Sequence, residues 1–243
     1  MSSYETRQLP APTYTFKHAL TREAAYQSLL ASTRRQLHQR IARVLEAQFA
    51  GLVETQPEVL AYHYRQSGNA EKAVTYLQRA GIQARQRSAF AEAHAHLTMG
   101  LEVLATMPET PTRPQHELDL LISLTRVLQA TKGDAAPELE PVLTRAAALC
   151  QQVGETLQRV VVLDALCVSH FIRGEYQAAQ VAAEQLLDLA QRQHNHAMLM
   201  TAHGRLGQTL FNVGAFAPAR THLEQALALL DPPRACDPVH RLW

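Results

Sequence analysis

Apolar residues recur three and four positions apart through most of this chain, a spacing that predicts amphipathic helices. Between residues 157 and 230 the pattern occurs twice, and each position of the second copy lies forty residues after its partner. Each copy predicts a helix, a tight turn at Gly174 or Gly214, and a second helix, because glycine adopts a left-handed backbone conformation without a Cβ clash. The matching positions are Leu163, Leu166, Cys167, His170, Gly174, Tyr176 and Ala179, followed by His203, Leu206, Gly207, Leu210, Gly214, Phe216 and Ala219.

Small residues mark where the two helices of each hairpin approach one another. Cys167 or Gly207 on the first helix and Ala179 or Ala219 on the second occupy the predicted contact points. A single hairpin buries few leucines, each contributing roughly 1.5–3 kcal/mol, so neighbouring hairpins must stack to form a stable core.

Two further copies and one extra helix precede this pair. One copy runs from Leu77 to Gly100 and carries Ser88 in place of the turn glycine, which predicts a less sharply specified turn. A degenerate copy covers residues 117–154, with a turn near Gly133. A short helix is expected over residues 57–68.

The repeated hairpin resembles the tetratricopeptide repeat (TPR), whose usual period is ~34 residues. This resemblance implies an all-α, right-handed α-solenoid that acts as a binding scaffold, and the forty-residue step implies slightly longer helices or loops. The proline-bearing segment 108–115 predicts a linker between two sub-blocks, 51–107 and 116–231. We expect residues 1–13 to be disordered and residues 232–243 to form a polar tail. A closing polar helix is not visible after residue 231, which suggests that the array continues in a longer protein.

Residues 14–50 carry a second resemblance. Residues 14–16 alternate like a short strand, and two helices are expected after them. The segment is similar to the end of the winged-helix arm in large bacterial signalling ATPases of the STAND class, often fused to class III nucleotide cyclases. This resemblance implies that a winged-helix-like remnant joins the array to an ATPase. The matching residues are Phe16, His18, Ala19, Leu20, Tyr26, Leu30, Arg34 or Arg35, Leu37 and His38. The chain has no G-x-x-x-x-G-K-[ST] phosphate loop and no aspartate pair typical of a cyclase, so it would be the sensor part without the ATPase.

Charge and cysteine content limit which partner classes and which cellular compartment are expected. A net charge of +1 gives no overall electrostatic case for binding nucleic acid or an anionic membrane. Cys150, Cys167 and Cys236 are too few and too scattered for a disulfide framework, which favours a reducing cytoplasm. Residues 1–13 do not resemble a signal peptide, and no apolar run approaches the ~20 residues of a membrane span.

Three residue groupings have the composition of a chemical site. Cys167 and His170 share a helical face and could hold a metal, but both lie at packed repeat positions, so core packing is the better interpretation. The pairs His94-x-His96 and His194-x-His196 point apart on a helix and are expected at the surface. Ser169 and His170 diverge, and no acid is placed to orient the imidazole. We therefore predict no catalytic, cofactor-binding or metal-binding residue, and no enzymatic activity.

The inner curve of the solenoid is the surface most suited to binding. First-helix residues just off the packing face are expected to line a mildly apolar groove for an extended peptide or an amphipathic helix. The alternative is that these residues pack against a neighbouring helix. The TPR proteins that clamp the carboxy-terminal carboxylates of chaperones use lysine and asparagine where this chain has Asp164 and Val168, which disfavours that partner class. The predicted groove residues are Asp164, Val168, Phe171, Ile172, Thr201, Gly204, Gln208, Phe211 and Asn212.

These features predict a protein-interaction or sensor module within, or beside, a STAND-type ATPase or cyclase. The alternative function is a DNA-linked transcriptional regulator that contacts DNA through basic amino-terminal helices while the array senses a ligand. Few of the basic residues share a face, so a solvated face or one that docks on an acidic ATPase is the simpler interpretation. The basic residues are Arg22, Arg34, Arg35, His38, Arg40 and Arg43.

Overall fold

The computed structural model describes residues 19–154 and 157–230, which form twelve α-helices and no strand. The fold is therefore an all-α helical-repeat solenoid, as the spacing of apolar residues predicts. The predicted strand at residues 14–16, the amino-terminal segment 1–13 and the tail 232–243 lie outside the described residues. The helices are α1 (Ala19–Ser28), α2 (Ala31–Gln48), α3 (Ala50–Thr55), α4 (Pro57–Ser67), α5 (Ala70–Gln86), α6 (Phe90–Ala105), α7 (Arg113–Lys132), α8 (Leu139–Val153), α9 (Leu157–Ile172), α10 (Tyr176–Arg192), α11 (His196–Asn212) and α12 (Phe216–Leu230).

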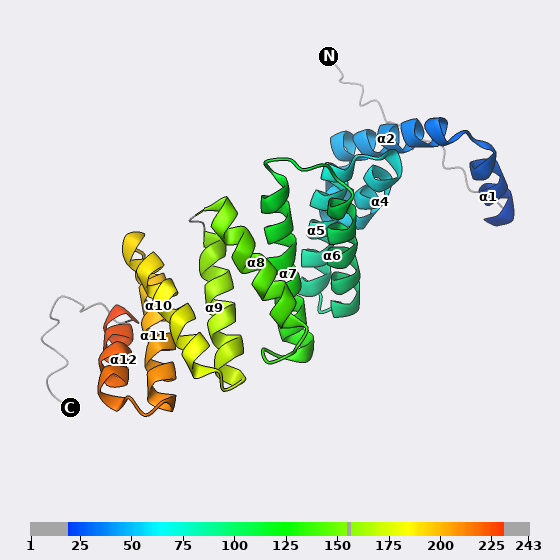
Figure 1. Ribbon diagram of the computed structural model, residues 1–243. Coiled ribbons are helices and arrows are strands. Elements are labelled where there is room, and N and C mark those ends of the chain that lie inside the picture. Colours follow the sequence, from blue (N-terminus) through cyan, green and yellow to red (C-terminus); the bar gives the residue numbers. More distant parts are fainter. Residues whose placement is uncertain (1–18, 155–156, 231–243) are drawn as a thin grey trace, which may run out of the picture.

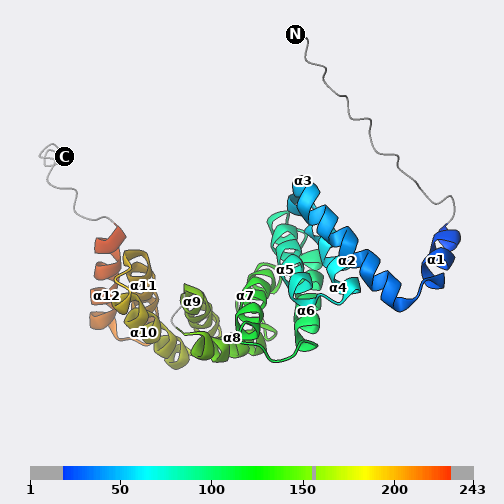
Figure 2. The same cartoon turned by 90° about the horizontal axis from the view of Figure 1, so that it is seen from above.

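Successive helices stack side by side from α2 to α12 and form an elongated array (Figure 1). The array is curved, and the view from above shows α7, α9 and α11 on the inner side of the arc with α8 and α10 on its outer side (Figure 2). This arrangement places the first helices of consecutive hairpins on the concave side. Among the described helices, none combines the length and the apolar character needed to cross a membrane.

The forty-residue period appears directly in the helix boundaries. α9 and α11 end at Ile172 and Asn212, and α10 and α12 begin at Tyr176 and Phe216. The turn glycines take left-handed φ values of 77° at Gly174 and 82° at Gly214. In both turns the residue after the glycine donates its amide N–H to the carbonyl five residues back, which satisfies one of the open carbonyls at the helix end.

The turn between α5 and α6 has the same geometry although it lacks a glycine. Ser88 takes a φ of 60°, and the amide of Ala89 bonds the carbonyl oxygen of Ala84 at 2.8 Å. The left-handed turn therefore forms here with a serine, at the cost of the Cβ clash that a glycine avoids. That the serine specifies this turn less sharply stays a prediction.

Replacing Ser88 with glycine should stabilise the protein by about 0.5–1 kcal/mol, since glycine removes the left-handed strain of about 1–2 kcal/mol but is more flexible when unfolded. Gly174→Ala is the reciprocal control. An added Cβ there meets no atom within 4 Å, so its loss of about 1 kcal/mol would come from the backbone alone. Urea unfolding followed by far-UV circular dichroism measures both changes. A Ser88→Gly variant less stable than the parent would contradict the prediction.

The hydrophobic core runs without interruption across the proline-bearing segment. A single buried cluster joins α5 (Val74), α6 (Leu97), α7 (Leu124), α8 (Leu143) and α9 (Ala165). Helix α7 begins at Arg113, inside the segment 108–115 predicted as a linker, and Pro114 lies in its first turn, where proline is tolerated. The two predicted sub-blocks therefore share this buried cluster.

The amino-terminal helices pack onto the array through polar contacts as well as apolar ones. Nδ1 of His38 on α2 lies 2.8 Å from Nδ1 of His63 on α4, and the Tyr26 hydroxyl lies 3.0 Å from Nε2 of His38. Burial lowers the pKa of His38, and burial together with the neighbouring His38 lowers the pKa of His63, which favours neutral rings that share a hydrogen bond. These contacts join α1 to α2 and α2 to α4.

Candidate functional site

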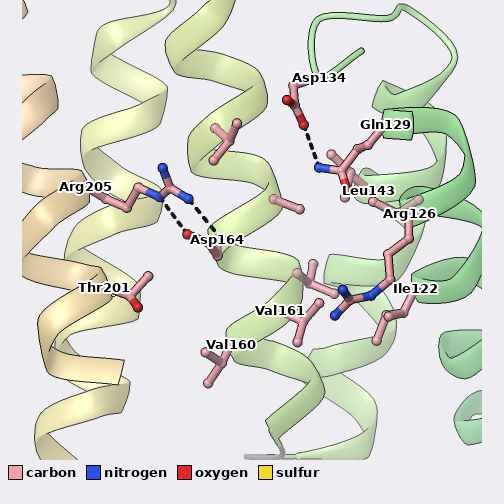
Figure 3. A pocket seen from close by; sticks show the side chains of 14 residues that line it. Ile122, Arg126, Gln129, Asp134, Leu143, Val160, Val161, Asp164, Thr201 and Arg205 are labelled. Atoms are coloured by element: carbon pink, nitrogen blue, oxygen red, sulfur yellow. Dashed lines mark hydrogen bonds and ion pairs between the residues drawn. The ribbon is translucent and has the colours of Figure 1, made fainter. Parts of the chain in front are cut away.

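A pocket of about 400 Å³ lies between α7, α9 and α11, the helices on the inner side of the arc (Figure 3). Each helix presents residues three and four positions apart, so one stripe from each helix faces the pocket. α7 supplies Ile122, Thr125, Arg126 and Gln129, α9 supplies Val161, Asp164, Ala165 and Val168, and α11 supplies Thr201 and Arg205. Leu143 of α8 and Asp134, which follows the α7 helix end, complete one side.

An ion pair crosses the pocket between consecutive hairpins. Nε of Arg205 lies 2.7 Å from Oδ1 of Asp164, and Nη2 lies 3.3 Å from Oδ2, so the guanidinium contacts both carboxylate oxygens. Both side chains are 33% exposed. The hydrogen bond to Asp164 raises the pKa of Arg205, so the guanidinium stays charged. The pair ties α9 to α11 and fixes the position of both charges.

The remaining polar groups of the pocket differ in how far they are satisfied. Nε2 of Gln129 donates to Oδ1 of Asp134 at 2.7 Å. The hydroxyls of Thr125 and Thr201 donate to carbonyls of their own helices. Arg126 is exposed, extends from α7 toward Val161, and forms no hydrogen bond or ion pair with any residue in the described ranges (Figure 3).

A smaller pocket of about 120 Å³ adjoins the first between α9 and α11. Val168 and Arg205 line both pockets, so the two pockets are neighbours on the same face of α9 and α11. Phe171, Ile172 and Gln208 line the smaller pocket only.

The structure brings six of the predicted groove residues to these two pockets, and the other three lie elsewhere. Asp164 and Thr201 line the larger pocket, Val168 lines both, and the three residues named above line the smaller one. Phe211, Asn212 and Gly204 line neither.

The aromatic residues of the predicted groove pack within their own hairpins. Phe171 meets Tyr176 edge to face at 5.6 Å and also packs on the cluster around Cys167, while Phe211 meets Phe216 at 5.4 Å. Packing against a neighbouring helix, the alternative interpretation, therefore describes Phe171 in part. Phe171 and Phe211 therefore do not line one groove together.

Sequence reasoning missed the α7 side of the pocket and Arg205. The repeat that contains α7 is degenerate, so its groove positions could not be aligned with those of the cleaner copies. The stripe from Ile122 to Gln129 nevertheless has the same three-and-four spacing as the stripe on α9, and that spacing could have identified it. Arg205 lies 41 residues after Asp164, close to one repeat, which is the separation that places residues on adjacent first helices.

The side chains weighed for chemistry have structural neighbours. Cys167 is 1% exposed, and burial raises the pKa of its thiol to about 11. Nδ1 of His170 lies 2.6 Å from Oε2 of Glu175 across the hairpin turn. Within residues 19–154 and 157–230, no three histidine, cysteine or acidic side chains gather as a metal site would require.

The basic residues of α2 differ in exposure and in their partners. His38 is 6% exposed and belongs to the contact between α2 and α4, so its place in an exposed basic set is wrong. Arg34 donates to Gln27 at 3.0 Å and stacks over the Tyr26 ring. Arg35, Arg40 and Arg43 are exposed on α2.

Comparisons with known proteins support the architecture without naming a function. No family model matches the chain. An uncharacterized protein of Rhizobium meliloti (strain 1021) is 30% identical over 120 residues, which are 49% of this chain and 12% of that relative. The crystal structure of BtubC (BKLC) from P. vanneervenii superimposes with a TM-score of 0.59 at 19% identity, covering 90% of this chain and 94% of that one. At this identity the likeness shows the fold alone.

Proposed function

We propose that the protein is a non-enzymatic protein-interaction module of TPR type that binds an extended peptide along its inner curve. The observation that carries this proposal is the pair of adjoining pockets that spans three first helices. Its walls combine valines with a few fixed polar groups, which is the usual composition of a recognition site. The helical-repeat fold is compatible with such a partner.

Binding across α7, α9 and α11 would also give the module a sensor role. Each hairpin contacts mainly its neighbours, so an occupant that touches three first helices would favour one curvature of the array over others. The occupant would then change the relative position of the two ends.

We place this module in the cytoplasm, as a regulatory part of, or a partner to, a STAND-type signalling ATPase. The support is the resemblance of residues 16–38 to the arm of those proteins, together with the relative in which the aligned segment is 12% of a much longer chain. Neither ATP binding nor ATP hydrolysis is expected from this chain. Titration calorimetry with Mg-ATP tests this part, and nanomolar affinity would overturn it.

The peptide-binding role can be tested by selecting a phage-displayed random dodecapeptide library on the full chain. Selected peptides should lose at least tenfold in affinity on Thr201→Trp, because the indole would fill the larger pocket. Gln185→Trp, on the exposed outer face of α10, is the matched control and should bind like the parent. Equal affinity for both variants would show that the peptides bind elsewhere, and failure to select any peptide would contradict the proposal.

A further inference from the structure

The charged groups of the larger pocket differ in what they can still bind. Asp164 has both oxygens on Arg205, and Asp134 already accepts a hydrogen bond from Gln129. Arg126 alone among the four charged side chains of this pocket has no partner in the described part of the chain. The pocket therefore offers an occupant one uncommitted cation.

The surroundings of Arg126 favour a carboxylate as its partner. The planar guanidinium can donate two parallel hydrogen bonds to a carboxylate, and such pairs are stronger than hydrogen bonds between neutral groups. Val161 and Ile122 line the pocket beside it, and an occupant that covers these apolar side chains would exclude water and strengthen the pair. A basic group would meet the uncommitted guanidinium of Arg126, while both carboxylates of the pocket are already engaged, Asp164 by Arg205 and Asp134 by Gln129.

The shape of the site favours a peptide over a free small acid. The larger pocket adjoins the smaller one at Val168 and Arg205, so an occupant that fills both pockets must be longer than a small acid bound at Arg126. An extended chain places alternate side chains on one side, which suits an acidic residue in the larger pocket and an apolar residue beside Phe171 in the smaller one.

We infer that the site selects peptides carrying an aspartate or glutamate whose carboxylate pairs with Arg126, with an aliphatic side chain near it in the sequence. The inference rests on the proposed peptide-binding function and adds the chemistry of the ligand. Arg205 is paired with Asp164 and lines the wall of the smaller pocket. It is not the group that pairs with the acidic residue of the peptide.

The test uses the same dodecapeptide library on four forms of the full chain: the parent, Arg126→Ala, Arg126→Glu and Arg43→Glu. Arg43→Glu is the matched control for Arg126→Glu, because it makes the same charge change at a residue that is exposed on α2, away from the pocket. The selected peptides are then measured by fluorescence anisotropy on each form, beside copies in which the acidic residue is replaced by its amide. Circular dichroism melts confirm that each variant is folded.

Enrichment of acidic residues is expected on the parent and on Arg43→Glu. Affinity should fall about tenfold on Arg126→Ala, and the amide copies should bind the parent about tenfold more weakly, with no further loss on the variant. Arg126→Glu should select basic residues at the same position.

Three outcomes would overturn the inference. Peptides that bind in the pocket with no acidic preference, or with a preference that Arg126→Ala leaves unchanged, would refute it while the peptide-binding function stands. Tight displacement of the peptides by free 3-methylbutanoate would show a small-acid site instead. Failure to select peptides on any form would remove the proposed function together with this inference.

Discussion

Replacing Glu46 with alanine is expected to lower the free energy of unfolding of the amino-terminal helices by about 2–3 kcal/mol. Glu46 lies on α2, and its carboxylate accepts hydrogen bonds from Tyr64 on α4 and from Lys72 and Tyr76 on α5. The two tyrosines are 1% and 4% exposed and stack with ring centroids 5.6 Å apart. Without the carboxylate, two largely enclosed hydroxyls lose their acceptor, and unpaired buried polar groups cost about 1–3 kcal/mol each. Glu46 is itself 33% exposed, which limits the loss to the lower part of that sum.

The same contacts predict how stability depends on pH. Burial acts to raise the pKa of Glu46, but the hydrogen bonds from Lys72, Tyr64 and Tyr76 outweigh it and lower the pKa to about 2. A carboxyl whose pKa is lower in the folded state stabilises the protein fully above its ordinary value of 4.5, and this contribution is lost as the pH falls toward 2. Glu46→Gln should therefore weaken the acid dependence in this range.

Hydrogen exchange read by mass spectrometry is the suitable measurement, because an end of a solenoid can unfold locally. Amides of α2 and α4 should exchange faster in Glu46→Ala, while amides of α10 and α11 should not change. Glu102→Ala provides the control, since Glu102 is exposed on α6. Equal protection of α2 in the parent and in Glu46→Ala would refute the structural role of this carboxylate.

The sequence predicted the repeat because its rules are local. A left-handed glycine, a small residue nine positions before an aromatic one, and a stripe of leucines each act within one hairpin, so Gly174 and Gly214 indicated the turns directly. The same locality explains why the groove residues on α9 and α11 could be proposed as a set. These two helices belong to the two copies that align without a gap.

The parts that sequence reasoning did not reach depend on contacts between hairpins. His38 was grouped with exposed arginines, yet its partner His63 lies 25 residues further along on another helix. The Arg205–Asp164 pair and the α7 side of the pocket likewise require the stacking geometry of consecutive first helices. A single sequence predicts on which face of its helix a residue lies. Which residue of another hairpin it contacts is determined by how the hairpins stack.

Gly81→Ala is expected to destabilise the protein by about 2 kcal/mol, because α5 and α6 approach too closely for a side chain at this position. A Cβ on Gly81 would lie 2.6 Å from Cγ of Leu97, and Leu97 is fully buried and cannot move aside. Overpacking costs about 1–3 kcal/mol, and a contact of 2.6 Å with a fully buried leucine belongs at the upper end of that range, from which the better helix propensity of alanine recovers about 1 kcal/mol.

Gly207 occupies the same repeat position as Gly81. Comparing the two separates the clash of the new Cβ from the enclosure of the leucine that it meets. Its Cβ would also lie 2.6 Å from a leucine Cγ, but this leucine, Leu223, is 39% exposed and can turn toward solvent. Gly207→Ala should therefore cost less than Gly81→Ala, and its remaining cost comes from the backbone oxygen of Ala219, which would lie 3.2 Å from the new Cβ. Gly51→Ala, where a Cβ meets nothing within 4 Å, should stabilise α3 by about 0.5–1 kcal/mol. Urea unfolding gives all three values.

Combining Gly81→Ala with Leu97→Val should cost less than the sum of the single changes, because the smaller side chain makes room for the new methyl group. Additive losses, or equal losses at Gly81 and Gly207, would show that enclosure of the facing leucine does not decide the outcome.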